Sequence, residues 1–518
     1  MMQIVYFKRD LRLHDHAPLA AAAARGPVLP LYIVEPSVVR ARDFDPAHWT
    51  FLRASLHDLR ERLATLGQPL VVRVGEAVPV FEALARAHTI GAIWAHEETG
   101  NNITYLRDRA LRRWARSRSI TFHELPNNGV VRRLPSRDDW PGIWESRVRQ
   151  PQVATPTALI PVTGIAPGPI PTGDALHLAR DLRPGAQPGG ETQAHTTLDE
   201  FLFVRGGNYH RSLSSPLMAI TGCSRLSPYL TWGNLSVRQV VHATRERLAA
   251  VAALPDAARA ELGGEWLRAL GAFADRLRWR CHFNQKFEDQ PDLEYVNMVR
   301  VYDGLREAAF REDTFAAWRD GMTGYPMIDA SMRALHDSGW INFRMRAMLV
   351  SFAAYQLWLH WREPAVYLAR VFLDYEPGIH YCQHQMQSGT TGINTLRIYN
   401  PVKQARDQDR DGVFVRRWLP ELAGVPDSFI HAPWLMPGLM QQMMGCVIGR
   451  DYPAPIVNHE VAARAARERI WAVRQSPEAQ EEADAVRERH GSRAQVYRPR
   501  RSGARSVPTA ANQLRLDL

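Results

Sequence analysis

Residues 222–230 read GCSRLSPYL, a run of small and polar residues at an expected helix start. Backbone N–H groups and hydroxyls at the start of a helix can hold a diphosphate, because these donors point outward and the helix dipole favours negative charge. A simple helix cap is the alternative, and an isolated Ser-Arg-Leu-Ser favours the cap. The sequence on either side decides between the two interpretations.

The sequence around this segment has the pattern of a helical domain. From residue 196 to about residue 473 it shows helical periods dense in Trp, Tyr, Phe, Met and Arg, with almost no strand-like alternation. We therefore predict an all-α domain over residues 196–475. Residues 151–190 are rich in Pro, Gly, Thr and Ala without apolar periodicity, which is typical of a linker, and we assign residues 136–195 to it.

Residues 1–135 alternate short β-branched runs with longer helical patterns. This rhythm predicts a doubly wound α/β domain with about five parallel strands, because parallel neighbours need a helical crossover between them. The expected crossover helices include residues 47–66 and 101–117. The expected strands are residues 4–7, 28–34, 70–74, 90–95 and 120–125. Since these strands carry no GxGxxG or Walker-type loop, the usual dinucleotide or triphosphate site is not supported.

A chain of 518 residues exceeds what one hydrophobic core normally supports, so two domains are expected. No run approaches the roughly 20 apolar residues of a membrane span, and the start lacks a signal-peptide pattern. We therefore expect a cytoplasmic protein without membrane contact. Reduced thiols, and neither a disulfide framework nor a metal site, are expected from the four scattered cysteines, Cys223, Cys281, Cys382 and Cys446.

The net charge of +10 is compatible with a polyanionic partner such as nucleic acid, because each neutralised phosphate releases counterions. Part of the excess reflects a preference for Arg over Lys, and part lies near the C-terminus, so charge alone leaves the partner open. Residues 478–490 predict a charged helix. We expect the basic tail, residues 476–518, to be partly disordered beyond that helix.

The segment 222–230 resembles the GTSRLSPYL signature of the photolyase/cryptochrome family, with one substitution. Other motifs that resemble those of the family follow in the family's order. They are FKRDLR at 7–12, WRDGMTGYPMIDA at 318–330, SGW at 338–340, RMR at 344–346, DYE at 374–376 and RIYNP at 397–401. The resemblance therefore extends from residue 1 to about residue 470.

The resemblance implies that FAD is bound in a U-shape inside the helical domain, with its diphosphate on the turn 223–227. It also implies that Arg346 and Asp374 form an ion pair beside the isoalloxazine. A charged pair in an apolar pocket stabilises a fold little, so cofactor tuning is the favoured interpretation and a structural salt bridge the alternative. The positions implied to bind the cofactor are Tyr209, Cys223, Ser224, Arg225, Leu226, Ser227, Arg280, Arg346, Asp374, Glu376 and His380.

Two tryptophans, Trp361 and Trp318, match the middle and outer members of the family's tryptophan chain, which carries electrons from the surface to the photoexcited flavin. Helical tryptophans are usually core residues, so only their position supports this role. His384 stands where the family has the inner tryptophan, and imidazole is a much poorer one-electron donor than indole. Trp358 or Tyr381 could provide a detour.

The lesion-binding face departs from the family pattern. Arg276 stands in place of the glutamate that contacts a cyclobutane pyrimidine dimer, and Met386 replaces the tryptophan that stacks on it. Asn342 and Phe343 occupy the positions of the His-His pair associated with (6-4) lesions, so the sequence does not identify the lesion.

Substrate contacts are nevertheless expected, because aromatic stacking can hold a flipped base and imidazole can donate a proton near neutral pH. Each histidine could equally be a packed structural residue. The expected DNA contacts are Arg276, Trp279, Gln285, Lys286, Met386, Arg397 and Lys403. The residues expected to act in catalysis are Trp279, His380, His384, Trp361 and Trp318.

Residues 96–101, HEETGN, follow the strand predicted at 90–95 and lie at its carboxyl end, where ligands of open α/β sheets bind. Many members of the family bind an antenna in this domain. The resemblance therefore leaves room for a second chromophore of the folate or deazaflavin type, with an empty cleft as the alternative.

Taken together, the resemblance implies a monomeric, FAD-dependent DNA photolyase driven by blue light. It would repair UV-induced pyrimidine dimers in damaged DNA by electron transfer from reduced flavin. A cryptochrome-like blue-light receptor is the alternative, favoured by the altered lesion face and the basic tail. A light-independent flavin or nucleic-acid binding protein is a third, favoured by the missing inner tryptophan.

Overall fold

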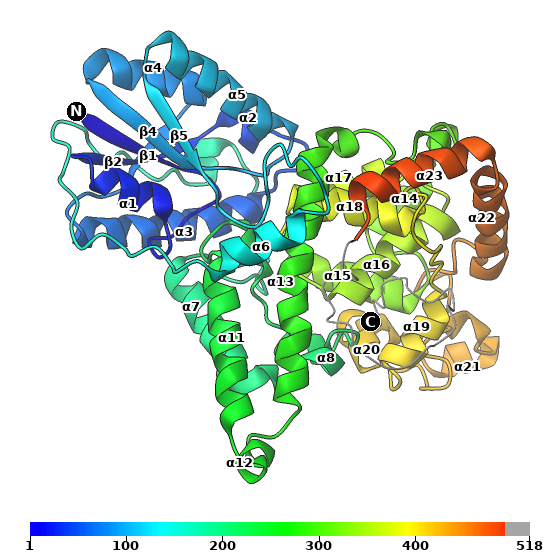
Figure 1. Ribbon diagram of the computed structural model, residues 1–518. Helices are drawn as coiled ribbons and strands as arrows, with labels where there is room; N and C mark the ends of the chain where they lie inside the picture. The colour runs from blue at the N-terminus through cyan, green and yellow to red at the C-terminus, as the bar shows by residue number, and fades with distance from the viewer. Residues whose placement is uncertain (182, 493–518) are drawn as a thin grey trace, which may run out of the picture.

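The computed structural model describes residues 1–181 and 183–492 and consists of an α/β part and a helical part (Figure 1). A sheet of five parallel strands in the order β3-β2-β1-β4-β5 forms the α/β part. Its strands are β1 (Met2–Phe7), β2 (Val28–Val34), β3 (Val71–Val74), β4 (Ile90–His96) and β5 (Thr121–Leu125). This confirms the doubly wound parallel sheet, and each strand lies within two residues of its predicted limits.

Both faces of the sheet are buried, which explains the unbroken apolar runs of its strands. Ile4 and Tyr6 of β1 face the side on which Phe81 packs, whereas Val5 and Phe7 face the side on which Leu56 packs. The helices that cover the sheet and connect its strands are α1 (Ala17–Ala23), α2 (Pro36–Val39), α3 (Pro46–Thr65), α4 (Ala77–Ala87) and α5 (Asn102–Ser117).

The segment assigned to a linker from its composition contains a helix that the sequence did not predict, α6 (Trp140–Arg149). The residues after α6 run along the sheet domain, since the Val72 amide donates to Pro167 O at 2.8 Å. They then reach the helical part, where the Gly185 amide donates to Asp337 O at 3.2 Å. Backbone hydrogen bonds therefore connect this segment to both parts of the molecule.

The helical part confirms the predicted all-α domain. Its longest pair of antiparallel helices, α11 and α13, extends away from the rest of the molecule and has α12 at its tip (Figure 1). The helices are α7 (Glu191–Glu200), α8 (Tyr209–Ser212), α9 (Met218–Gly222), α10 (Ser227–Thr231), α11 (Val237–Ala253), α12 (Asp256–Glu261), α13 (Trp266–Asp289), α14 (Glu312–Arg319), α15 (Pro326–Ser338), α16 (Phe343–Ser351), α17 (Arg362–Val371), α18 (Pro377–Ser388), α19 (Pro401–Gln408), α20 (Val413–Trp418), α21 (Gly438–Met443), α22 (His459–Arg474) and α23 (Pro477–His490).

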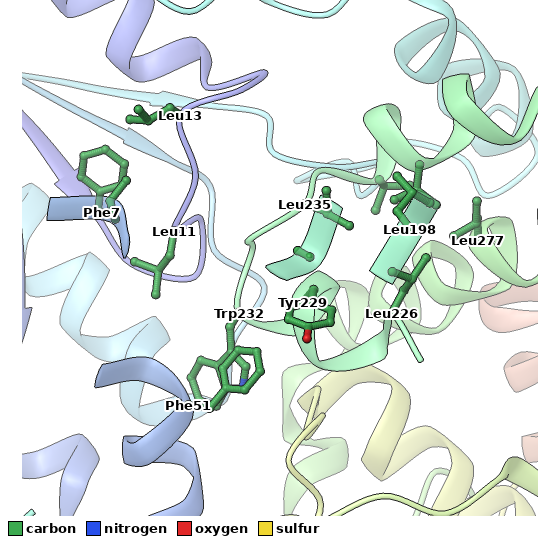
Figure 2. Close-up of a cluster of buried hydrophobic side chains, with 14 of the residues drawn as sticks. Phe7, Leu11, Leu13, Phe51, Leu198, Leu226, Tyr229, Trp232, Leu235 and Leu277 are labelled. Atoms are coloured by element: carbon green, nitrogen blue, oxygen red, sulfur yellow. The ribbon is translucent and has the colours of Figure 1, made fainter. Parts of the chain in front are cut away.

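The two parts share one hydrophobic core (Figure 2). Leu11 and Phe51 of the α/β part lie in the same buried cluster as Tyr229 and Trp232 of the helical part. Gly233 makes the close approach possible, because a Cβ on this residue would lie 2.2 Å from Arg9 O. The α/β part therefore packs directly against the turn that follows α10.

The C-terminal helix α23 confirms the charged helix predicted at 478–490. The partial disorder expected for the tail concerns residues 493–518, which lie outside the described residues. Among the described helices, none combines the length and the apolar character needed to span a membrane.

Candidate functional site

The turn between α9 and α10 lies at the centre of the candidate site. Arg225 adopts a left-handed backbone conformation with φ of 60°, and its Nε donates to Gln187 Oε1 at 3.1 Å. The Arg205 guanidinium donates to the carbonyls of Cys223 and Ser224. Since α10 has only five residues, its dipole contributes little, and the turn is held by side chains instead.

Positive charge is concentrated around this turn. Burial raises the pKa of the Cys223 thiol to about 12, although four guanidinium groups lie close enough to lower it, those of Arg225, Arg205, Arg276 and Arg346. Tyr209 is buried nearby, and burial is the main cause of its raised pKa. The Cys223 thiol raises this pKa further, whereas the charge of Arg276 lowers it. Four cations around one turn form an environment that favours a polyanion such as a diphosphate.

The Arg346–Asp374 ion pair lies beside the same turn. Arg346 donates to both carboxylate oxygens of Asp374 at 2.9 Å, and its guanidinium carbon lies 4.1 Å from the ring centre of Phe372. Burial lowers the pKa of Arg225 to about 10, and the charge of Asp374 is the strongest influence in the opposite direction. The turn and the ion pair therefore belong to one site.

A second acid, Glu376, lies at the start of α18. It accepts hydrogen bonds from Arg280 Nη2 at 2.6 Å and from Asn284 Nδ2 at 3.1 Å. Asn284 lies one helical turn after Arg280 on α13, so the two donors share a face of that helix. Two buried acceptors on these helices have no partner among the described residues, Asn284 Oδ1 on α13 and His384 Nε2 on α18. They leave hydrogen-bonding capacity for a bound group.

The two histidines of α18 are packed against each other, with ring centroids 4.1 Å apart. His380 Nε2 contacts Ala365 O at 2.7 Å, and His384 Nδ1 contacts His380 O at 2.8 Å. Burial lowers the pKa of His380 well below its usual range and that of His384 to about 4. Both rings are therefore neutral near pH 7, which disfavours their action as imidazolium acids.

Two of the expected DNA contacts have buried side chains. Gln285 is 0% exposed, and its amide bonds the backbone N and O of Val131 at 2.7 and 2.9 Å. The Lys286 ammonium is buried over the Phe283 ring, 5.3 Å from its centre, and burial lowers its pKa to about 8. Both side chains are therefore largely enclosed in this structure, and their contact with DNA stays a prediction.

The other expected substrate contacts differ in exposure. Trp279 is half-buried, with its ring 4.9 Å from that of His282. Met386 and Arg397 are also half-buried, and exposed Lys403 pairs with Asp407 at 2.7 Å. These positions remain open to a ligand.

The tryptophans matched to the electron-transfer chain are both buried. Trp361 donates from Nε1 to Asn297 Oδ1 at 2.7 Å, and Trp318 donates from Nε1 to Leu349 O at 3.1 Å. Trp318 is 0% exposed, so an external donor does not reach it directly. The half-buried Tyr367 has its ring centroid 6.1 Å from that of Trp318.

Sequence reasoning missed three residues of the site: Arg205, Gln187 and Asn284. Arg205 and Gln187 act on the backbone or side chain of the turn 223–227 from distant positions, and no local motif marks them. Asn284 could have been found, because its four-residue spacing from Arg280 places both on one helical face.

A cleft of ≈ 760 Å³ opens at the carboxyl ends of the strands, between the sheet and the helical part. It contains Glu98, Gly100 and Asn101 from the segment in which an antenna site was predicted. Its other walls include Tyr32, Glu35, Asp43, His48, Trp232 and Tyr375. A second cleft of ≈ 490 Å³ runs between the two parts and reaches Arg280 and Glu376.

The second cleft also exposes an edge of a buried cluster formed by Asp10, His16 and His96, whose ligand-type atoms lie within 4.8 Å of one another. Asp10 Oδ2 lies 3.0 Å from His16 Nε2 and 2.8 Å from His96 Nδ1. Because the Leu19 amide donates to His16 Nδ1, the ring presents its Nε2 proton to Asp10. Ordinary hydrogen bonds thus satisfy the cluster without a metal ion.

Comparisons with known proteins agree with this architecture. Residues 3–134 match the family model described as DNA photolyase, and residues 273–472 match the model for the FAD binding domain of DNA photolyase. The deoxyribodipyrimidine photo-lyase of Streptomyces griseus is 32% identical over 483 residues, which cover 90% of this chain and 98% of that protein. The cryptochrome DASH of Gloeobacter violaceus is 29% identical, with 90% and 95% covered.

Solved structures show the same likeness. A bacterial class III photolyase from Agrobacterium tumefaciens superposes with a TM-score of 0.78 at 27% identity, covering 92% of this chain and 98% of the other. An archaeal photolyase from Sulfolobus tokodaii with two FAD molecules gives 0.73 at 25% identity, covering 91% and 100%. The chain belongs to the photolyase/cryptochrome family.

Proposed function

We propose that the protein is a FAD-dependent DNA photolyase that uses blue light to repair UV-induced pyrimidine dimers. The convergence of four guanidinium groups on the turn 223–227, beside the Arg346–Asp374 pair, carries this proposal. A FAD molecule offers the diphosphate for the turn and the polar ring edge for the acids. The family relation supports the same cofactor.

When bound and reduced, FAD supplies the light-driven electron that splits the dimer. The chain would hold it with its cationic turn, while the unpartnered acceptors Asn284 Oδ1 and His384 Nε2 and the carboxylate of Glu376 receive N–H groups. Arg346 and Arg280 fix the two carboxylates so that neither can rotate away. The residues proposed to bind FAD are Tyr209, Cys223, Ser224, Arg225, Leu226, Ser227, Arg280, Arg346, Asp374, Glu376 and His380.

Damaged DNA is the proposed partner. Enzymes that react with a base in a duplex must take it out of the stack and hold it in a pocket. Trp279 and Met386 would pack on the extruded bases, and Arg276, Arg397 and Lys403 would contact phosphates. Neutral His380 and His384 would then shape the pocket rather than serve as charged acids.

A repair assay tests the proposal. The purified, chemically reduced protein is illuminated with blue light in the presence of oligonucleotides that carry either a cyclobutane dimer or a (6-4) product. We expect light-dependent restoration of one lesion, no restoration in the dark, and none with a variant that carries both Arg225→Ala and Asp374→Ala. Failure on both lesions by protein that retains FAD would overturn the proposal.

That failure would favour a cryptochrome-like blue-light receptor, the second candidate. The observation in its favour is the altered lesion-binding face, where Arg276 and Met386 replace the glutamate and the tryptophan of the family pattern. We also propose that the ≈ 760 Å³ cleft holds a second chromophore, because the predicted antenna segment lines it. A cytoplasmic location, a monomeric state and the lack of a metal ion remain predictions.

A further inference from the structure

A hydrogen-bonded pair of buried tyrosines, Tyr375 and Tyr381, lies between the proposed flavin site and the α/β part. The two hydroxyl oxygens are 3.3 Å apart, and Tyr375 also contacts Asp43 Oδ2 at 2.8 Å. A hydroxyl has a single proton, and the shorter contact is to the carboxylate, so Tyr375 donates to Asp43 and accepts from Tyr381. The pair therefore forms a directed chain that ends on an acid.

Ring contacts connect this pair to the residues already assigned to electron transfer. The ring centroid of Tyr381 lies 6.3 Å from that of Trp361 and 6.3 Å from that of Tyr375. Tyr375 in turn lies 5.1 Å from His380 and stands between Asp374 and Glu376, the two acids proposed to contact the flavin. Aromatic rings thus continue from Trp361 to the flavin-binding loop, although His384 occupies the inner tryptophan position.

Asp43 belongs to the loop before α3, so the chain crosses from the helical part to the α/β part. Its Oδ2 also accepts a hydrogen bond from Asn101 Nδ2 at 2.8 Å, which fixes the carboxylate. Asp43 and Tyr375 both line the ≈ 760 Å³ cleft. A proton received by Asp43 would therefore have a way out to solvent.

We propose that Tyr375 and Tyr381 replace the inner tryptophan as electron donors, and that oxidation ends in a neutral radical on Tyr375. The inference rests on the proposed function, because the oxidant is a photoexcited oxidised flavin. One electron leaves Tyr375 for this oxidant, directly or through its aromatic neighbours. The phenolic O–H bond breaks, the proton passes to Asp43 Oδ2, and a tyrosyl radical and a carboxylic acid remain.

The environment of the phenols supports a coupled transfer of proton and electron. Burial raises the pKa of Tyr375 and of Tyr381 well above the ordinary value. Neither phenol therefore ionises at neutral pH in its reduced form. A phenol loses its proton readily once oxidised, and the 2.8 Å contact provides an acceptor without any rearrangement.

The full chain with oxidised FAD bound tests the inference. We expect illumination at low temperature to give an electron paramagnetic resonance spectrum with the hyperfine pattern of a neutral tyrosyl radical. Ring-deuterated tyrosine should collapse that pattern in the unmutated protein. The signal should be lost in Tyr375→Phe. In the unmutated protein, formation of the radical should be slower in D₂O than in H₂O. Asp43→Asn should remove this difference in rate.

Tyr6→Phe is the matched control, because Tyr6 is a buried tyrosine whose hydroxyl contacts another carboxylate, Glu35 Oε1, at 3.3 Å. It should leave the radical unchanged. A tryptophan radical alone in illuminated, FAD-loaded protein would overturn this inference and leave the proposed function standing. A chain that binds no FAD at all would overturn both.

Discussion

The Arg346–Asp374 pair is the charge pair on which the proposed flavin site depends most. Its two hydrogen bonds are both 2.9 Å long, and the side chains of Arg346 and Asp374 are 22% and 4% exposed. Removing the cation would leave a buried carboxylate without its partner, which is far more costly than the pair's own contribution to stability.

We therefore predict that Arg346→Gln lowers the free energy of unfolding by about 3 kcal/mol in the flavin-free protein. Chemical denaturation measures this change. Arg319→Gln, which breaks the exposed Arg319–Asp320 pair, is the control and should cost less than about 1 kcal/mol. Equal losses in the two variants would contradict the prediction that burial makes the loss of Arg346 more costly than the loss of Arg319.

The site residues that could be predicted most directly are those that lie in a motif. The turn 223–227, Arg346 and Asp374 all lie in motifs, and the structure brings them together. The burial of Gln285 and Lys286 could not be predicted, because it depends on neighbours such as Val131 that come from elsewhere in the sequence. A sequence pattern gives the face of a helix and not what covers it.

At the scale of the elements, the alternation of short apolar runs with helical patterns made the sheet predictable. Helix α6 was not predicted, because the composition of its surroundings is typical of a linker. Strands such as β2 are continuous β-branched and apolar runs, because both faces of the sheet are covered. Helix α6 has Pro141 in its first turn and is followed by a Pro- and Gly-rich stretch. The helical pattern of its ten residues was therefore not recognised within a segment that resembles a linker. Its buried Trp140, Trp144 and Val148, spaced four residues apart, were the signal for a helix.

The connection after α10 depends on one glycine. Gly233 has φ of 73°, and a Cβ there would lie 2.2 Å from Arg9 O. Gly233→Ala should lower the free energy of unfolding by at least about 3 kcal/mol, because backbone strain and overpacking add. Thermal and urea unfolding measure the loss.

Gly263→Ala separates the two causes. Gly263 has φ of 63° but open space around its Cβ position, so this variant carries the backbone strain alone. It should cost about 1 kcal/mol. If both variants lost the same stability, the close approach to Arg9 would not be a constraint on the fold.

At the scale of the whole molecule, Glu191 joins the two parts. From the start of α7 it accepts hydrogen bonds from the Leu13 amide at 2.6 Å and the His14 amide at 3.1 Å, and it also pairs with Arg62. Burial alone would raise the pKa of Glu191, but hydrogen bonds from His14, His195 and Leu13 and the charge of Arg62 outweigh it. The pKa is therefore well below the ordinary value of 4.5.

A carboxylate with a lowered pKa stabilises the folded state fully above its unfolded value, and this contribution is lost as pH falls towards the folded value. Glu191→Gln should therefore cost about 2 kcal/mol at pH 7, and the difference from the unmutated protein should shrink below pH 4.5. Urea unfolding across this range measures it. Asp427→Asn, an exposed carboxylate, should show no such trend. A difference that stays constant with pH would contradict the assignment.

We propose that FAD is held between the turn 223–227 and the Arg346–Asp374 pair. Flavin content per chain, measured by absorbance after purification with excess FAD, tests this claim most directly. We expect about one FAD per chain in the unmutated protein. We expect none in the variant with both Arg225→Ala and Asp374→Ala, whose helical circular dichroism should be retained. Undiminished FAD in that folded variant would contradict this location of the FAD site.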